Sequence, residues 1–156
     1  MIKNKYFSFL LIFSITLFAS VLGSFVTKNF KEPWYSELIL PSFNPPSWVF
    51  APVWIMLYLM MSFAIWRVWV KTLNIKILKI YFFHLFFNSI WSIIFFGFHN
   101  IGIALINLIL ILTLILILMK IYYKVEKISF YLMIPYFLWT SYALLLNSSI
   151  FLLNNN

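Results

Sequence analysis

The chain has 156 residues, of which 65% are hydrophobic, 22% are aromatic and only 9% are charged, and its formal net charge is +8. A soluble domain of this size needs more charge to cover its surface, so the composition indicates an integral membrane protein and excludes a soluble globular domain. Nucleic acid is not an expected partner of the basic residues, because these sit at the ends of apolar runs, where membrane proteins keep them.

Five apolar segments are long enough to cross a bilayer, since a helix needs about 20 apolar residues to span the roughly 30 Å hydrocarbon core. They are Tyr6–Val26, Trp48–Val70, Ile80–Phe98, Ile101–Met119 and Ser129–Leu153. The first resembles a signal peptide with a cleavage site near Gly23, but its apolar run is longer than a typical signal, which favours a retained helix. The predicted fold is an all-α integral membrane protein: a single domain over residues 1–156, built as a bundle of five transmembrane helices.

Two segments stand out by composition: the connection between the first and second predicted helices, and the fourth predicted helix. The connection Thr27–Ser47 is long, and loops of this length are usually functional lids or disordered linkers. Its aromatic residues Trp34, Tyr35 and Phe43 favour an ordered cap. Ile103–Leu118 is nearly pure Leu and Ile, and we expect it to face lipid.

The basic residues are distributed unequally between the two ends of the predicted bundle. With five crossings, the N-terminus and the loops 71–79 and 120–128 share one side. That side holds nine of the eleven basic residues: Lys3, Lys5, Arg67, Lys71, Lys76, Lys79, Lys120, Lys124 and Lys127. The positive-inside rule therefore predicts a cytoplasmic N-terminus and an outer long loop. The plasma membrane is the expected location, as no targeting extension precedes the first helix.

The predicted helices contain few residues suited to catalysis or metal binding. None of the five segments contains Asp or Glu, and Arg67 lies about one turn from a helix end, where its side chain can snorkel to the interface. Cysteine is absent, and His84 and His99 are the only imidazoles, so neither a thiolate site nor a structural zinc site is expected. We therefore predict no catalytic residue, no metal site and no required cofactor.

Aromatic and uncharged polar residues recur on one face of three predicted helices. Phe50, Trp54 and Tyr58 follow an i, i+4, i+8 pattern in the second helix. The corresponding residues are His84, Asn88, Trp91 and Phe95 in the third helix, and Pro135, Trp139, Ala143, Leu146 and Ile150, with Asn147 beside them, in the fifth. Polar side chains avoid lipid, so the faces that carry the asparagines should point into the bundle.

The helical rise places several of these side chains at similar depth. At about 1.5 Å per residue, Trp54 lies roughly 9 Å below the outer surface, Trp91 roughly 10 Å and Ala143 roughly 15 Å. Aromatic rings around a small residue form a slot for a flat hydrophobic ligand, with amide and indole N–H groups to orient it. The alternatives are plain core packing for the tryptophans, helix–helix hydrogen bonds for the asparagines and a packing role for His84.

Three stretches resemble the TspO/MBR family, which comprises bacterial tryptophan-rich sensory proteins and the mitochondrial translocator protein, or peripheral benzodiazepine receptor. They are Pro41-Ser-Phe-Asn-Pro-Pro-Ser-Trp-Val-Phe-Ala-Pro-Val-Trp-Ile-Met-Leu-Tyr58, Asn88-Ser-Ile-Trp91-Ser-Ile-Ile-Phe-Phe96 and Pro135-Tyr-Phe-Leu-Trp139-Thr-Ser-Tyr-Ala143 with Leu146-Asn147 following. The resemblance runs from about Trp34 to Asn154, with the three stretches in the family's order and spacing.

The resemblance implies a five-helix bundle with a lid over a pocket for porphyrins such as protoporphyrin IX and haem, and often a homodimer. By the family's pattern the pocket positions are Trp54, Asn88, Trp91, Trp139 and Ala143, with Tyr35 in the lid; we add Tyr58, His84 and Asn147 from their spacing. His84 stands where the family often has glutamine. The cholesterol-recognition segment of animal members has no match after the fifth helix, which makes sterol binding doubtful.

Three classes of function are consistent with this sequence. The first is a sensor or transporter that binds porphyrins and related flat hydrophobic molecules. The second is a membrane enzyme that degrades porphyrin by photo-oxidation, as suggested for some relatives, although no acid, base or nucleophile here demands it. The third is a non-catalytic regulatory or structural membrane partner.

Overall fold

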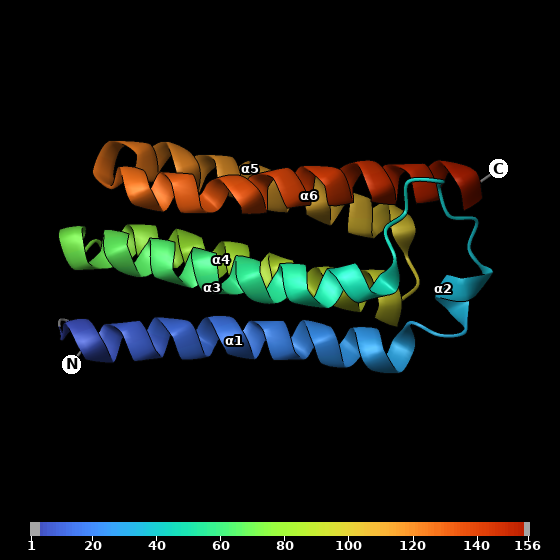
Figure 1. Cartoon of the computed structure of the whole chain (residues 1–156), viewed down its shortest axis with the longest axis horizontal. Coiled ribbons are helices and arrows are strands. Elements are labelled where there is room, and N and C mark those ends of the chain that lie inside the picture. The colour runs from blue at the N-terminus through green and yellow to red at the C-terminus, as the bar shows by residue number, and fades with distance from the viewer. Residues whose placement is uncertain (1–3, 155–156) are drawn as a thin grey trace.

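The computed structural model describes residues 4–154 and forms a bundle of long helices with one short helix at its end (Figure 1). The elements are α1 Lys5–Phe30, α2 Trp34–Glu37, α3 Ser47–Thr72, α4 Ile75–Ser92 with its π-helical continuation η1 Ile93–Gly97, α5 Ile101–Val125 and α6 Lys127–Asn154. Five helices are long and apolar enough to cross a membrane, counting α4 and η1 as one. The predicted all-α membrane bundle is therefore confirmed.

The long helices form a closed ring in the order α1, α3, α6, α5, α4, and α4 packs back on α1. Short connections dictate this antiparallel arrangement: α3 and α4 are joined by Leu73 and Asn74, and α5 and α6 by Glu126 alone. Asparagine side chains accept hydrogen bonds from the first turns of three helices, at Asn4, Asn74 and Asn100, as expected for N-cap residues. Helix α1 is an integral member of the ring, which is the arrangement of a retained helix.

The helix boundaries differ from the predicted ones mainly at the basic end. The third span begins at Ile75 rather than Ile80, the fourth continues to Val125 rather than ending at Met119, and the fifth begins at Lys127. Hydropathy detects the part of a helix that lies in hydrocarbon, whereas lysine-bearing turns continue the helix into the interface. The loops predicted at 71–79 and 120–128 are consequently shorter.

The expectation that Ile103–Leu118 faces lipid holds for one face of the helix, where Ile106 and Leu116 are exposed, and is wrong for the other face. In α5, the side chains of Leu108, Ile111 and Ile115 are buried, and Asn107 donates a hydrogen bond to the carbonyl of Phe87 in α4 at 3.0 Å. Leucine and isoleucine are equally suited to lipid and to a protein interior, so composition alone could not distinguish the two environments.

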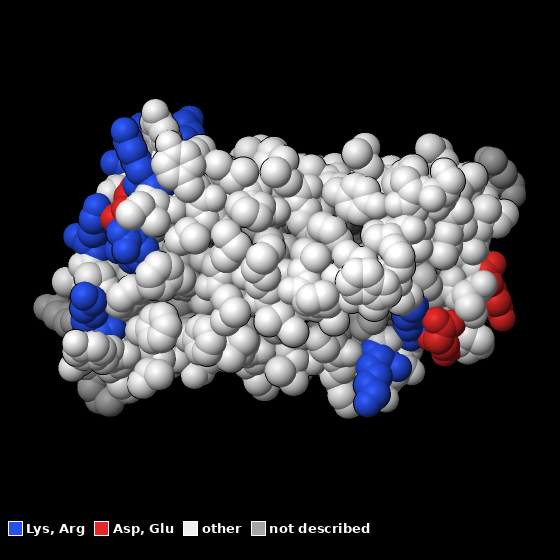
Figure 2. Space-filling model, viewed as in Figure 1, with Lys and Arg blue, Asp and Glu red and all other residues white. Residues whose placement is uncertain are grey.

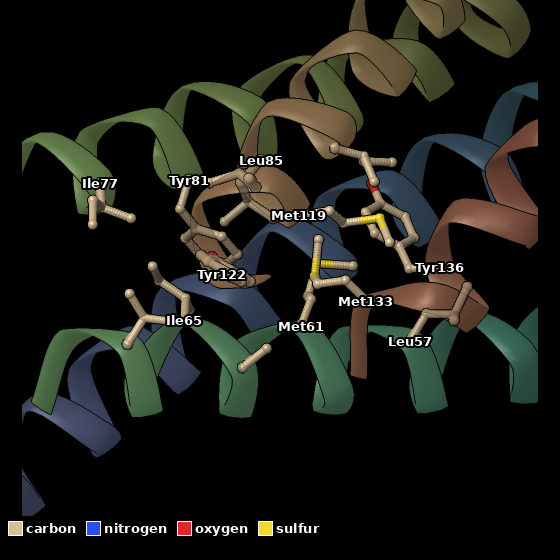
Figure 3. Packing of buried hydrophobic residues seen from close by; sticks show 14 of the residues in the cluster. Leu57, Met61, Ile65, Ile77, Tyr81, Leu85, Met119, Tyr122, Met133 and Tyr136 are labelled. Carbon is tan, nitrogen blue, oxygen red and sulfur yellow. The ribbon is translucent and has the colours of Figure 1, made fainter. Parts of the chain in front are cut away.

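The half of the bundle near the α3–α4 and α5–α6 turns is densely packed. Figure 3 shows Met61 of α3 beside Met119 and Met133, with Tyr81, Tyr122 and Tyr136 filling the space between the helices. Tyr81 is fixed by a hydrogen bond of 2.8 Å with Thr16 of α1. This half of the bundle therefore has a continuous hydrophobic core.

Charged side chains gather at the two ends and leave the sides of the visible face bare (Figure 2). The packed end carries the basic residues of the α1 start and of the two short turns, while the end with α2 carries Lys28, Lys31, Glu32 and Glu37. Lys3, which belongs to the predicted basic end, lies outside the described residues.

The buried acid Glu126 directly follows α5 and joins the end of this helix to α3 and α6 at the packed end. Its carboxylate pairs with Lys71 and, at 3.3 Å, with Arg67, both on α3, and it accepts a hydrogen bond of 3.3 Å from the N–H of Ile128 in the first turn of α6. Arg67 therefore has an ion-pair partner, which the expectation of simple snorkelling did not include. The hydrogen bond from Lys71, with Arg67 behind it, lowers the pKa of Glu126 from its usual value.

The substitution Glu126→Gln should lower the melting temperature by about 2–4 °C, since ion pairs near a surface contribute about 1 kcal/mol or less. A lowered pKa means that the carboxylate stabilises the fold above the ordinary carboxyl pKa and stops doing so as the pH falls through the lowered value. The difference between the wild type and the variant, measured by thermal unfolding in detergent, should therefore be constant near neutral pH and shrink as the pH falls below the ordinary carboxyl pKa of about 4.3. Glu37→Gln, at an exposed position on the opposite end, is the control. A difference in melting temperature that does not change with pH would contradict a stabilising role of the ionised Glu126 carboxylate.

Candidate functional site

A cavity of about 390 Å³ lies in the half of the bundle that carries α2. All five long helices contribute to its wall, and α2 contributes Tyr35 from above. Ligand pockets commonly measure about 300–1,000 Å³ and are mostly apolar with a few polar groups. The cavity thus has the size and the composition of a small-molecule site.

Eight of the nine residues predicted for the site line this cavity. They are Tyr35, Trp54, Tyr58, Asn88, Trp91, Trp139, Ala143 and Asn147. The ninth, His84, is fully buried in α4 and does not line the cavity. The structure brings together side chains from four separate segments, as the matched depths predicted, while their role in binding a ligand stays a prediction.

Aromatic rings form two opposed parts of the wall. On one side, Phe50 of α3 meets Trp139 of α6 edge to face, with ring centroids 6.0 Å apart. On the other, Trp91 of α4 stacks on Phe95 of η1 at 5.0 Å. Offset and edge-to-face contacts of this kind are the favourable ones, and they hold the rings in fixed orientations before any ligand arrives.

The π-helical turn η1 explains why two consecutive phenylalanines reach the interior. Neighbouring residues of an α-helix point about 100° apart, so a narrow buried face rarely includes both. Phe95 and Phe96 are nevertheless both buried and both line the cavity. The wider π turn inserts an additional residue at this point, and such turns are frequent at functional sites.

A chain of hydrogen bonds forms the polar floor of the cavity. Tyr58 of α3 donates to the side-chain oxygen of Asn88, and the Asn88 amide nitrogen donates to the hydroxyl of Tyr136 in α6 at 2.8 Å. The Tyr136 hydroxyl is also 2.7 Å from Nε2 of His84. The Tyr136 hydroxyl therefore accepts from Asn88 and is also hydrogen-bonded to the imidazole of His84, so it connects α6 to α4 twice. His84 therefore stands behind the floor and orients it.

Three cavity residues carry buried polar atoms that are unpaired within the part of the chain that the structure describes. These atoms are the hydroxyl oxygen of Thr140, Nε1 of Trp91 and both polar side-chain atoms of Asn147. An unpaired buried polar group costs about 1–3 kcal/mol, so such groups are uncommon without a purpose. Trp91 and Asn147 give the cavity two donor groups and an acceptor that a polar group on a ligand can engage, and the Thr140 hydroxyl can act as either.

The connection between α1 and α3 is an ordered lid, as its aromatic content predicted. Its middle is tied to the last turn of α6 by a reciprocal pair of hydrogen bonds between Asn154 and the backbone of Ile39, at 2.9 and 3.0 Å. Closer to α3, Tyr142 of α6 donates a hydrogen bond to the carbonyl of Phe43 at 2.6 Å. Near α2, Trp34 stacks on His99 at 4.5 Å.

Sequence reasoning missed the contribution of α1. Five of its residues, and Lys31 just after its end, line the cavity: Ser20, Gly23, Ser24, Thr27, Lys28 and Lys31. Their spacing is that of one helical face, and the small and hydroxyl-bearing side chains within an apolar helix were the available signal. At Gly23 a Cβ atom would lie 3.3 Å from Oγ of Ser92, so glycine allows close approach of α1 to α4.

The lining suits binding rather than acid–base chemistry. No Asp or Glu occurs among the described residues that line the cavity, and the described chain contains no group of three metal-binding side chains. What the arrangement offers is stacking surface, a small number of hydrogen-bonding groups and exclusion of water.

Comparisons with known proteins agree with this architecture. A family model described as the TspO/MBR family matches residues 11–153 and so includes most of α1, further toward the N-terminus than the resemblance at Trp34 indicated. A tryptophan-rich protein TspO of Archaeoglobus fulgidus is 34% identical over 135 residues, covering 85% of this chain and 87% of the relative.

Two further relatives come from distant organisms. The translocator protein of Homo sapiens is 34% identical over 139 residues, covering 83% of this chain and 82% of the relative. A tryptophan-rich sensory protein of Cereibacter sphaeroides is 32% identical over 125 residues, covering 80% of this chain and 79% of the relative. With the family match spanning nearly all of the helical bundle, the chain belongs to the TspO/MBR family.

Proposed function

We propose that this membrane protein is a sensor or transporter that binds porphyrins, such as protoporphyrin IX and haem, and related flat hydrophobic molecules. Family membership supports a sensor or transporter role in general, since relatives carry the names translocator protein and tryptophan-rich sensory protein. The observation that carries the finer proposal is the aromatic cavity beneath the lid.

The shape and chemistry of the cavity fit a flat ring system. A planar ligand between the Trp139 side and the Trp91 side would meet aromatic faces or edges on both of its surfaces, as stacking requires. The floor at Asn88 and the unpaired atoms of Trp91 and Asn147 could then fix its rotation within the plane.

Haem would find no axial ligand in this arrangement from His84, because its side chain is fully buried behind the floor, is hydrogen-bonded to Tyr136 and does not line the cavity. Stacking of the porphyrin ring on the aromatic side chains would therefore bind metal-free and iron porphyrins alike. Such binding requires no resident cofactor.

Photo-oxidative degradation of porphyrin is the second candidate, favoured by three indole rings that share the cavity: Trp54, Trp91 and Trp139. Illumination of a porphyrin complex followed by product analysis separates it from binding alone. Recovery of unchanged porphyrin would contradict the enzymatic function and leave ligand binding as the proposed function. A purely structural partner, the third class, would retain its cellular activity after Trp54 and Asn88 are both replaced.

Protoporphyrin IX should quench the tryptophan fluorescence of the detergent-solubilised protein, and Trp139→Ala should weaken binding about tenfold, because the ring loses one stacking partner. The matched control is Trp48→Ala, since Trp48 is 75% exposed and lies outside the cavity. An absence of quenching in the wild type, or equal affinity of the wild type and Trp139→Ala, would contradict the proposal.

We also propose that the packed, basic end faces the cytoplasm and that the lid lies on the outer side of the plasma membrane. The separation of charge between the two ends supports this orientation through the positive-inside rule.

The absence of cysteine from the chain makes the orientation directly testable with single introduced cysteines. In intact cells, a membrane-impermeant maleimide should label Ser36→Cys in the lid, and should label Lys76→Cys only after the cells are opened. Both positions are exposed, so burial does not limit either reaction. Labelling in the reverse order would overturn the orientation.

A homodimer is part of the same proposal. Only 17% of the apolar span of α1 is buried within the chain, which leaves a broad face for lipid or for a second copy. Light scattering of the detergent-solubilised protein distinguishes a monomer from a dimer.

A further inference from the structure

A smaller groove of about 180 Å³ lies between α1 and α4, near the residues at which the two helices begin. Its wall includes Ser8, Leu11 and Ile12 of α1 and Leu78, Lys79 and Phe82 of α4. Both helices begin at the basic end of the bundle (Figure 1), so this α1–α4 groove is remote from the lid and from the cavity beneath it. Because Leu11 and Lys79 are exposed, the groove is open to the surroundings of the bundle, which in a membrane are lipid.

The wall of the α1–α4 groove presents apolar atoms only. Ser8 and Ile12 are almost fully buried and form its floor, and the Ser8 hydroxyl is used in a hydrogen bond of 2.9 Å to the carbonyl of Lys5 on the same helix. Apolar cavities of about 150 Å³ exclude water and bind small hydrocarbons, whereas pockets for larger ligands begin at about 300 Å³. The α1–α4 groove therefore suits a slender hydrocarbon such as an acyl chain.

Positive charge at the groove is not balanced by acidic residues of the chain. Lys79 lines the groove, and Lys76 lies one turn nearer the beginning of α4. The sequence contains three acidic residues in total. Of these, Glu126 is already paired with two basic residues of α3, and the other two belong to the lid at the opposite end. The counter-ion for Lys76 and Lys79 must therefore come from outside the chain.

The beginning of α4 adds to the same positive potential. The N-terminal end of a helix carries the equivalent of about half a positive elementary charge, which disfavours nearby cations and favours anions. The first turn of α4 contains no acidic residue and carries Lys76. Lys5 of α1 is directed elsewhere, since its Nζ lies 5.6 Å from the ring centroid of Trp66 in α3. An anion bound at Lys76 and Lys79 would thus offset a repulsion that the sequence leaves uncompensated.

We propose that the α1–α4 groove is a binding site for an anionic phospholipid, in which one acyl chain lies along the groove and the phosphate binds Lys76 and Lys79. A lysine stem lies along apolar surface while its ammonium group reaches the interface, which is the level of the lipid headgroup. Basic side chains between helices at the membrane surface attract anionic headgroups. The site shares no lining residue with the cavity beneath the lid, so it does not depend on porphyrin binding. A lipid bound there contacts both helices and would strengthen the attachment of α1 to α4.

Native mass spectrometry of the full-length protein in detergent tests this inference. The protein is titrated with phosphatidylglycerol, which is anionic, or with phosphatidylcholine of the same acyl chains, which carries no net charge, and the affinity for the first bound lipid is measured. The wild type should bind phosphatidylglycerol about tenfold more tightly than phosphatidylcholine.

Two kinds of variant locate the headgroup and the acyl chain separately. Lys76→Gln/Lys79→Gln should bind phosphatidylglycerol about tenfold more weakly and leave the affinity for phosphatidylcholine unchanged, whereas the control Lys120→Gln/Lys124→Gln removes the same charge from α5 at the same end and should change neither. Ser8→Leu fills the floor of the groove and should weaken binding of phosphatidylglycerol about tenfold, because methylene groups of the chain lose their buried place. Ser14→Leu makes the same change at an exposed position of α1 outside the groove and is its control.

Three outcomes would overturn the lipid site. The first is equal affinity of the wild type for the two lipids, or a preference that the Lys76/Lys79 double variant retains. The second is an unchanged affinity of Ser8→Leu for phosphatidylglycerol, which would show that the chain does not lie in the groove. The third is a dimer that Ser8→Leu converts to a monomer without loss of lipid, which would assign the groove to a second copy of this chain. Thermal unfolding of each variant verifies that the bundle is intact.

Discussion

The hydrocarbon core of a bilayer contains no water, so a polar side chain there must find its hydrogen-bonding partner within the protein. Four polar side chains of this chain, Tyr58, Asn88, Tyr136 and His84, find such partners in one hydrogen-bonded relay, which joins α3, α4 and α6 at the middle of the bundle. Apolar contacts between helices bring little net driving force in lipid, because lipid tails are as apolar as leucine. The relay therefore specifies how three helices face one another, and the cavity lies directly above it.

The two halves of the bundle achieve stability by different means. The basic half is filled by large side chains, among them Met61, Tyr81 and Met133, which are all fully buried. The other half holds the cavity, so fewer side chains meet at its centre, and its helices are joined across the top by the lid. A site placed in the looser half can accommodate a ligand without disturbing the part that maintains the fold.

Much of this architecture follows from the sequence by simple physical rules. Segment length and hydropathy predict five spanning helices, and the 3.6-residue period places Trp54, Asn88 and Trp139 on inward faces. The π turn at Phe95 and Phe96 escapes such reasoning, because a single inserted residue changes which side chains face inward without leaving a mark in composition. Likewise, nothing in the local sequence of Glu126 indicates its partners on α3, which lie more than fifty residues earlier in the chain.

The middle of the lid is bound to Asn154, in the last turn of α6. The final residues of the spanning region are thus part of the enclosure of the cavity, although they contribute nothing to its wall. Truncation just before Asn154 would leave all the spanning helices in place and remove this contact with the lid, while the hydrogen bond from Tyr142 to Phe43 would remain. A purification tag attached directly after this residue would crowd the same contact, so fusion partners are better joined through a flexible linker or at the opposite end.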